Sequence, residues 1–158
     1  MEIQTRDYGT VDIDESSIIG FDDGIIGFEA FHDYVLLNVC DEPSPFRCLQ
    51  SVEDSGLAFI LFDPFCVRPD YEVEISEDAA ARLSIENSED AVILAIAVVP
   101  EDIKKMCFNL KAPVIINAKI NKGIQYVTDN GDYGVRHFLY DEMERSKKQG
   151  VCGGRAAV

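Results

Sequence analysis

The sequence is poor in the residues from which metal centres and hydrolytic sites are most often built. It contains only two histidines, and its five cysteines are scattered, with no C-x-x-C pair among them. Structural zinc is held by grouped Cys and His ligands. A serine hydrolase needs a histidine beside its nucleophile, commonly in a G-x-S-x-G turn that is also missing here. We therefore expect no metal, and we expect His32 and His137 to have structural or surface roles.

Long apolar runs are also lacking. The longest, Ala91–Val99, is about half of the roughly 20 residues that a membrane-spanning helix needs. The start of the chain is acidic and polar, unlike a signal peptide. We expect a soluble, cytoplasmic protein that makes no contact with membranes. Cys48, Cys66 and Cys107 are expected to act as small apolar residues in or beside strands, and Cys152 is the thiol expected to be exposed.

No nucleotide-binding or calcium-binding loop is recognisable. The segment GIIGFE (Gly24–Glu29) has two glycines three residues apart, but it lacks the third glycine of a dinucleotide fingerprint and the lysine of a P-loop. It is more simply a turn in which glycine adopts a positive φ. DNGD (residues 129–132) is interpreted as a tight turn, because no D-x-[DN]-x-[DN]-G calcium loop is present. We expect no cofactor.

Positive charge is scarce in the first two thirds of the chain. Residues 1–103 hold 24 Asp and Glu against four Arg, a net charge of −20, whereas residues 104–158 hold ten Lys and Arg against five acids, a net charge of +5. Because nucleic-acid affinity depends on cations that displace condensed counterions, direct binding of nucleic acid is disfavoured. Two interpretations fit the acidity: it keeps the protein in solution, or it attracts a basic protein partner in a salt-sensitive way.

Strand patterns dominate the sequence. Val11 and Ile13 alternate with acids, as in a half-buried strand, and Tyr71–Ile75 shows the same alternation. Ala91–Val99 is apolar throughout and is expected to be a central strand. Further short apolar runs bounded by turn residues are Tyr34–Val39, Phe46–Val52, Leu57–Phe62, Val114–Asn117 and Ile124–Thr128. The polar tetrapeptide Glu53–Gly56 joins two of these runs and predicts a β-hairpin.

Helix signals are few. Ser76–Leu83 begins with a serine N-cap and two acids that suit the helix dipole, Glu101–Met106 follows a proline, and Tyr140–Gln149 carries acids early and basic residues late. Many short strands with two or three short helices predict a mainly β fold, a small antiparallel β-barrel or sandwich. We expect a single domain at residues 1–140, followed by a C-terminal helix and flexible tail at residues 141–158.

A family resemblance rests on four segments in a fixed order, which are GIIGFE (Gly24–Glu29), LQSVEDSGLAFILFDPF (Leu49–Phe65), NLKAPVIIN (Asn109–Asn117) and DYGVRHFL (Asp132–Leu139). Together, over about residues 1–139, they resemble the flagellar assembly factor FliW family. The sequence departs from the family pattern at Arg47 and Cys48, where bulkier apolar residues are usual, and at Gly134, where a proline commonly stands. The resemblance implies a compact, β-barrel-like domain.

The resemblance also implies partners. FliW proteins bind CsrA, a small basic RNA-binding protein that represses translation of flagellin mRNA, and they bind flagellin, so that the two ligands exchange on FliW. We therefore expect a non-enzymatic assembly factor whose acidic surface captures CsrA. The residues expected to bind a partner are Glu53, Asp54, Asp63, Asp70, Glu72 and Glu74, with Phe65 and Tyr71 as apolar anchors.

Two other interpretations stay open on the sequence alone. A secretion chaperone that shields flagellin would bind flagellin without any effect on translation. A small enzyme with an unrecognised site would have a closed pocket lined by converging polar groups instead of an exposed acidic face. The adjacent acid pairs do not single out a general acid and base, because acids at turns and helix starts are common in so acidic a chain.

Overall fold

The computed structural model describes residues 1–40, 42–129, 131 and 133–148. Its strands are β1 (Glu2–Gln4), β2 (Thr10–Asp12), β3 (Ile18–Gly20), β4 (Asp33–Asn38), β5 (Phe46–Ser51), β6 (Ala58–Phe62), β7 (Val92–Val98), β8 (Cys107–Asn117), β9 (Lys122–Gln125) and β10 (His137–Phe138). Its helices are α1 (Glu77–Arg82), α2 (Leu139–Lys148) and the 3-10 helices η1 (Glu15–Ser17), η2 (Pro64–Cys66), η3 (Ser88–Asp90) and η4 (Ile103–Lys105). Cys152 and the predicted flexible tail lie outside the described residues.

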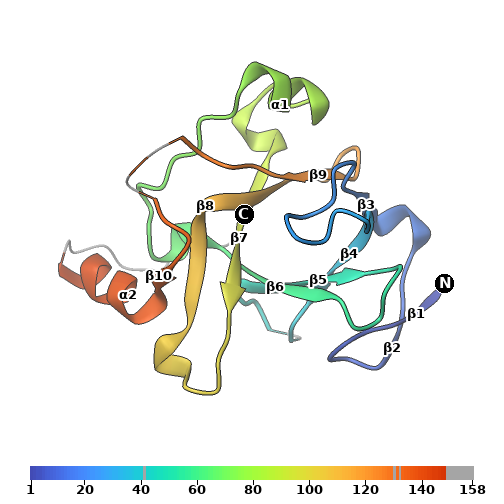
Figure 1. The fold of residues 1–158 in the computed structure, drawn as a ribbon, viewed down its shortest axis with the longest axis horizontal. Helices are drawn as coiled ribbons and strands as arrows, with labels where there is room; N and C mark the ends of the chain where they lie inside the picture. Colours follow the sequence, from blue (N-terminus) through green and yellow to red (C-terminus); the bar gives the residue numbers. More distant parts are fainter. Residues whose placement is uncertain (41, 130, 132, 149–158) are drawn as a thin grey trace.

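Within this part of the chain, seven strands close into a barrel in the order β8-β7-β6-β5-β4-β3-β9, with β9 paired back onto β8. Neighbouring strands are antiparallel except β3 and β9, which meet in one parallel pair, Gly20 with Lys122. β10 extends the sheet beyond β8, and β1 and β2 form a separate hairpin at the N-terminus (Figure 1). The prediction of a mainly β fold with a small, largely antiparallel barrel is confirmed.

The β5–β6 hairpin forms as predicted, and a buried glutamine holds its turn. Gln50, which lies opposite Ala58, has no exposed surface. Its Nε2 donates to the carbonyl oxygens of Ser51 and Leu57, and its Oε1 accepts a hydrogen bond from the backbone N–H of Arg6. Because both ends of the buried amide have partners, its burial costs little. The side chain fixes the hairpin and attaches it to the segment after β1.

The apolar core has two main parts. One fills the barrel and includes Phe21, Tyr34 and Leu61, and the other packs β7 and β8 against the segment that follows β6. The strand predicted at Tyr71–Ile75 is wrong, because this segment pairs with none of the described strands. Tyr71 is 3% exposed and donates from its Oη to the carbonyl oxygen of Leu110 at 2.7 Å. The segment is therefore attached to the barrel by a side chain and not by a ladder of backbone hydrogen bonds.

β7 lies between β6 and β8, as expected for the long apolar run. β8 is longer than predicted, since it begins at Cys107 and not at Val114. The register of the two strands shifts between Leu94 and Ile96, so residues 110–113 bulge away from β7. The proline in this bulge therefore interrupts no hydrogen bond to β7.

The helices follow their end signals. α1 begins as predicted at Ser76, whose Oγ accepts a hydrogen bond from the backbone N–H of Ala79 at 3.2 Å. The helix predicted at Glu101–Met106 is shorter, the single 3-10 turn η4. α2 begins at Leu139 and packs near β10 and η4, with Glu142 only 7% exposed. The division into a domain and a tail at residue 140 stays a prediction.

Two glycines are required by close contacts. Gly24 has a φ of +67°, and a Cβ there would lie 2.7 Å from the Cα of Glu29, which confirms the turn predicted for GIIGFE. At Gly123 in β9, a Cβ would lie 2.6 Å from Cζ of the fully buried Phe21. The barrel can therefore close around this phenylalanine only because β9 has no side chain at that position.

Three of the cysteines are sheltered, as expected. Cys48 and Cys107 are buried and Cys66 is partly buried, whereas Cys40 is exposed. Burial, with a further contribution from Asp63, raises the pKa of the Cys66 thiol to about 11, and burial also raises the pKa of Cys48. Both thiols therefore stay protonated at neutral pH and behave as small apolar groups.

The helices of the described residues are all too short or too polar to cross a membrane.

Candidate protein-binding surface

The fold separates the residues predicted to bind a partner into two groups. Glu53 and Asp54 lie in the turn of the β5–β6 hairpin, whereas Asp63 follows the opposite end of β6. Asp70 and the segment Tyr71–Glu74 continue from there. The acids that cluster in sequence between residues 53 and 74 therefore do not form one patch at the hairpin turn.

The two acids of the hairpin turn are engaged by backbone groups. Glu53 Oε1 accepts hydrogen bonds from the backbone N–H groups of His32 and Asp33, both at 2.8 Å, and these bonds lower the pKa of Glu53. Asp54 Oδ1 accepts from the backbone N–H of Gly56 at 2.9 Å. Both carboxylates are exposed, and each also shapes a loop. Their role in binding a partner stays a prediction.

Asp63 and Tyr71, two of the predicted contacts, are not on the surface. Asp63 is 3% exposed and accepts a hydrogen bond from the backbone N–H of Phe65, which starts η2. The ring of Tyr71 packs against Phe65 and, edge to face, against Tyr133, with ring centroids 5.8 and 4.7 Å away. Phe65 is half-buried in the same cluster. Tyr71 is therefore a core residue that attaches its segment to the barrel, and the role of Phe65 and Tyr71 as apolar anchors for a partner stays a prediction.

Asp70 is exposed but paired. Its carboxylate accepts a hydrogen bond from Arg145 of α2 at 3.1 Å, and Arg68 lies 3.6 Å from its other oxygen. The hydrogen bond from Arg145 lowers the pKa of Asp70. A helix more than 70 residues away in sequence thus neutralises one of the predicted binding acids.

Glu72 and Glu74 are exposed and line a groove of about 290 Å³ with Thr128 and Asp129, which we call the acidic groove. Within the described residues, none of its three carboxylates makes an ion pair or a hydrogen bond. Sequence reasoning found Glu72 and Glu74 but missed the opposite wall. No local signal could have found it, because Thr128 and Asp129 reach the groove only through the closure of the barrel.

A buried charged network fastens α2 to the barrel. Arg68 Nη1 lies 3.2 Å from Glu142 Oε1, and His137 Nδ1 lies 2.9 Å from the same oxygen. His137 Nε2 accepts a hydrogen bond from the backbone N–H of Gly134 at 2.8 Å, so the proton of a neutral imidazole sits on Nδ1 and is donated to Glu142. Arg68 also stacks over the Tyr133 ring. His137 thus has the structural role that was expected of it.

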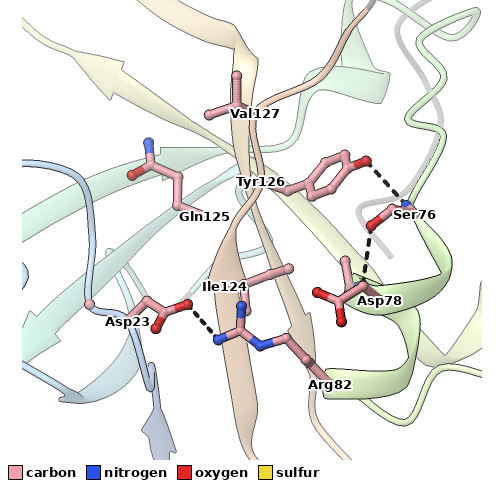
Figure 2. A pocket seen from close by; sticks show the side chains of 10 residues that line it. Asp23, Ser76, Asp78, Arg82, Ile124, Gln125, Tyr126 and Val127 are labelled. Atoms are coloured by element: carbon pink, nitrogen blue, oxygen red, sulfur yellow. Dashed lines mark hydrogen bonds and ion pairs between the residues drawn. The ribbon is translucent and has the colours of Figure 1, made fainter.

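A second depression, of about 190 Å³, lies between α1 and β9 (Figure 2). Its polar groups hold α1 in place: Arg82 pairs with Asp23 at 2.5 Å, and the Oη of Tyr126 accepts a hydrogen bond from the backbone N–H of Ser76. In the part of the chain that is described, no three His, Cys, Asp or Glu side chains are grouped closely enough to hold a metal ion. The interactions around this depression therefore attach α1 to the barrel.

The closed barrel, with an unpaired acidic groove on its surface, defines this chain as a small, mainly β domain with an open, charged surface site. The family described as FliW protein matches residues 2–139. The chain belongs to the FliW family, as the four sequence segments predicted.

Individual relatives agree over most of their length. The flagellar assembly factor FliW of Alkaliphilus metalliredigens is 40% identical over 149 residues, which are 94% of this chain and 92% of that protein. The protein of the same description from Caldanaerobacter subterraneus subsp. tengcongensis is 38% identical over 146 residues, covering 92% and 97% of the two chains. A crystal structure of the flagellar assembly factor FliW superposes with a TM-score of 0.82 at 32% identity and covers 88% of this chain and 96% of that one.

Proposed function

We propose that this protein is a non-enzymatic regulator of flagellar assembly that binds both the basic RNA-binding protein CsrA and flagellin. When it holds CsrA, translation of flagellin mRNA proceeds, and when unexported flagellin accumulates and occupies it, CsrA is released and flagellin synthesis falls. The single observation that carries the proposal is membership of the FliW family. The protein acts in the cytoplasm, where flagellin is translated, without binding nucleic acid directly.

The charge distribution supports a basic partner. Residues 1–103 carry a net charge of −20, and in the acidic groove the exposed Glu72 and Glu74 make no ion pair with any of the described residues. An RNA-binding protein carries Lys and Arg for phosphates, so opposite potentials steer the two proteins together. This attraction falls with salt, because the Debye length shrinks from about 10 Å at 0.1 M to about 3 Å at 1 M.

The same charge supports antagonism of RNA binding. A complex of CsrA with a partner this acidic presents a repulsive field to an RNA backbone, whose binding depends on displacement of counterions by cations. Antagonism therefore does not require that the RNA site be covered. Because the repulsion is electrostatic, it is strongest at low salt.

The surface also supports a binding role in place of catalysis. The relatives are described as assembly factors. The acidic groove is open and lined by carboxylates. In the other depression, Arg82 and Asp23 form an ion pair that holds α1 in place. A catalytic pocket would instead place groups of contrasting character around a shielded space.

The test is a calorimetric titration of CsrA, and separately of flagellin, into the full chain at low and at high salt. We expect both to bind, with CsrA weakened by salt and displaced by flagellin. A cell-free translation assay of flagellin mRNA with CsrA should show relief on addition of this protein. Binding of flagellin alone, with no effect on translation, would favour a secretion chaperone, and binding of neither protein would overturn the proposal.

A further inference from the structure

The acidic groove brings free carboxylates together from distant parts of the chain. Glu72 and Glu74 come from the extended segment after η2, and Asp129 comes from the segment after β9. Many other acids of the described chain serve an internal structure, as Asp63 does for η2 and Asp90 does for Lys119. The three groove carboxylates are hydrogen-bonded to none of the described residues, so their charges are available to a ligand.

A buried hydroxyl in the wall of the groove is a second, independent observation that points to a ligand site. Thr128 lines the groove and is only 4% exposed, and its Oγ1 has no hydrogen-bond partner among the described residues. Buried polar side chains nearly always have a partner, so each exception needs a physical reason. A threonine hydroxyl oxygen has two lone pairs, and neither is used by the described residues. Oγ1 is therefore able to accept a hydrogen bond from a donor that enters the groove.

Both walls of the groove are held by hydrogen bonds to one neighbourhood of the barrel. The backbone N–H of Glu72 donates to the Oη of Tyr133 at 3.2 Å, and the adjacent Tyr71 Oη donates to the carbonyl oxygen of Leu110. On the other side, the backbone N–H of Thr128 donates to the carbonyl oxygen of Lys111 at 2.7 Å. Since Leu110 and Lys111 are consecutive in β8, the two walls share a support. The site is therefore formed before any ligand arrives, which lowers the entropy cost of binding.

We propose that the acidic groove binds the guanidinium or ammonium group of one arginine or lysine side chain presented by a protein partner. The groove has room for such a group and part of its aliphatic stem, at about 290 Å³. A guanidinium has five N–H donors, and the groove offers three carboxylates and one hydroxyl as acceptors. No three of the described carboxylate, His or Cys side chains are close enough together to hold a metal ion.

The inference rests on the proposed function for the identity of the partner, but the groove can be tested by itself. The probe is arginine amide with its α-amino group acetylated, titrated into the full chain and followed by backbone amide chemical shifts. We expect saturable shifts at Glu72–Glu74 and at Thr128–Asp129, and none with the citrulline amide acetylated in the same way, which has nearly the same shape without the guanidinium charge. Saturable shifts confined to other residues, or equal shifts with citrulline amide, would overturn the proposal.

A pair of matched variants separates the groove from general acidity. E72Q/E74Q removes two groove carboxylates, and E86Q/E89Q removes two exposed carboxylates that lie outside it. E72Q/E74Q should weaken binding of arginine amide about tenfold or more, because charge-assisted hydrogen bonds are lost. E86Q/E89Q should change it by less than about twofold, because only a screened charge is removed. Similar effects of the two double variants would contradict a specific site.

Thr128→Val tests the hydroxyl and at the same time controls for folding. The substitution removes a buried hydroxyl that has no partner among the described residues, so the melting temperature should stay the same or rise. Affinity for arginine amide should nevertheless fall about threefold, because one acceptor is gone. An unchanged affinity in a folded variant would show that the hydroxyl does not contact the ligand and would overturn that part of the proposal.

Titration of CsrA into the same variants distinguishes failure of the groove from failure of the proposed function. If CsrA binds the wild-type chain and E72Q/E74Q equally well, the proposed function stands and the groove is not its contact. If arginine amide binds in the groove but CsrA does not bind the chain, the groove stands and the proposed partner is wrong.

Discussion

The guanidinium of Arg145 lies 3.1 Å from the carboxylate of Asp70, only two residues before Glu72 of the acidic groove. Helix α2 therefore places a positive charge beside the surface that is proposed to attract a basic partner. Arg145 therefore competes with a basic partner for the negative charge of this surface. The helix does not depend on Arg145 for its attachment, because Glu142 fastens it to the barrel separately.

Removal of this charge should strengthen the attraction of a basic partner. In R145Q, Asp70 loses its hydrogen bond from Arg145 and the local potential becomes more negative, so CsrA should bind about two- to fivefold more tightly at low salt. The difference should vanish at high salt. The matched control is R82Q, which frees Asp23 beside α1 instead. Equal gains in the two variants would show that only the total charge matters.

The buried network at Glu142 should contribute more to stability than any surface pair. In E142Q, Arg68 keeps its charge in a site where its side chain is 11% exposed, but it loses the nearer and more buried of its two carboxylate partners. We expect the free energy of unfolding to fall by about 3 kcal/mol, measured by urea denaturation. D141N removes a neighbouring acid that is exposed. A loss in E142Q no larger than that in D141N would contradict the role of the network.

The closure of the barrel around Phe21 should make Gly123 sensitive to a single methyl group. G123A places a Cβ 2.6 Å from the Phe21 ring, so the ring or the strand must shift, and we expect a loss of about 1–3 kcal/mol in the free energy of unfolding. G20A in β3 is the control, since a Cβ there meets no atom within 4 Å. The prediction fails if thermal denaturation shows the two variants to be equally stable.

The hydrogen bonds to Glu53 predict a defined dependence of stability on pH. They lower its pKa in the folded state below the usual value of 4.5. The stabilisation is therefore fully present above about pH 4.5 and is lost as the pH falls through the lowered pKa. E53Q should flatten the decline of the unfolding free energy between neutral pH and about pH 3. The control variant is E29Q, which also removes one exposed acid, and E53Q should flatten the profile more than this control does.

The cysteines should differ in their reaction with iodoacetamide at mildly alkaline pH. The thiolate is the reactive form, and the Cys66 thiol, with a pKa raised to about 11, is almost wholly protonated under these conditions. Cys40 is exposed and should be modified before Cys48, Cys66 and Cys107, as peptide mass mapping would show. Modification of Cys66 should accelerate only in denaturant. Equal rates for Cys40 and Cys66 in the folded protein would contradict this account.

The sequence predicted the elements whose causes are local. The β5–β6 hairpin follows from a polar turn between two apolar runs, and α1 follows from the Ser76 cap, so both appear where they were expected. The alternation at Tyr71–Ile75 misled the prediction. It arises because Tyr71 faces the core while Glu72 and Glu74 face solvent, a pattern that an extended segment attached by side chains shares with a strand.

The candidate site could be predicted only in part. Glu72 and Glu74 stand out in the sequence as exposed acids, but their significance depends on Thr128 and Asp129, which the barrel brings to them from more than 50 residues away. The neutralisation of Asp70 by Arg145 is equally long-range. Such pairings are set by how the strands close and by where α2 docks, and no local pattern encodes either.

The neighbouring strands of the barrel are paired over very different lengths. Between β4 and β5 five residue pairs form a ladder, whereas β3 and β9 meet at Gly20 and Lys122 alone. A seam with so few backbone bonds opens at a smaller free-energy cost than the rest of the cylinder. Amide protons flanking it should exchange with deuterium sooner than those of the central strands, and transient water entry to the interior should begin there.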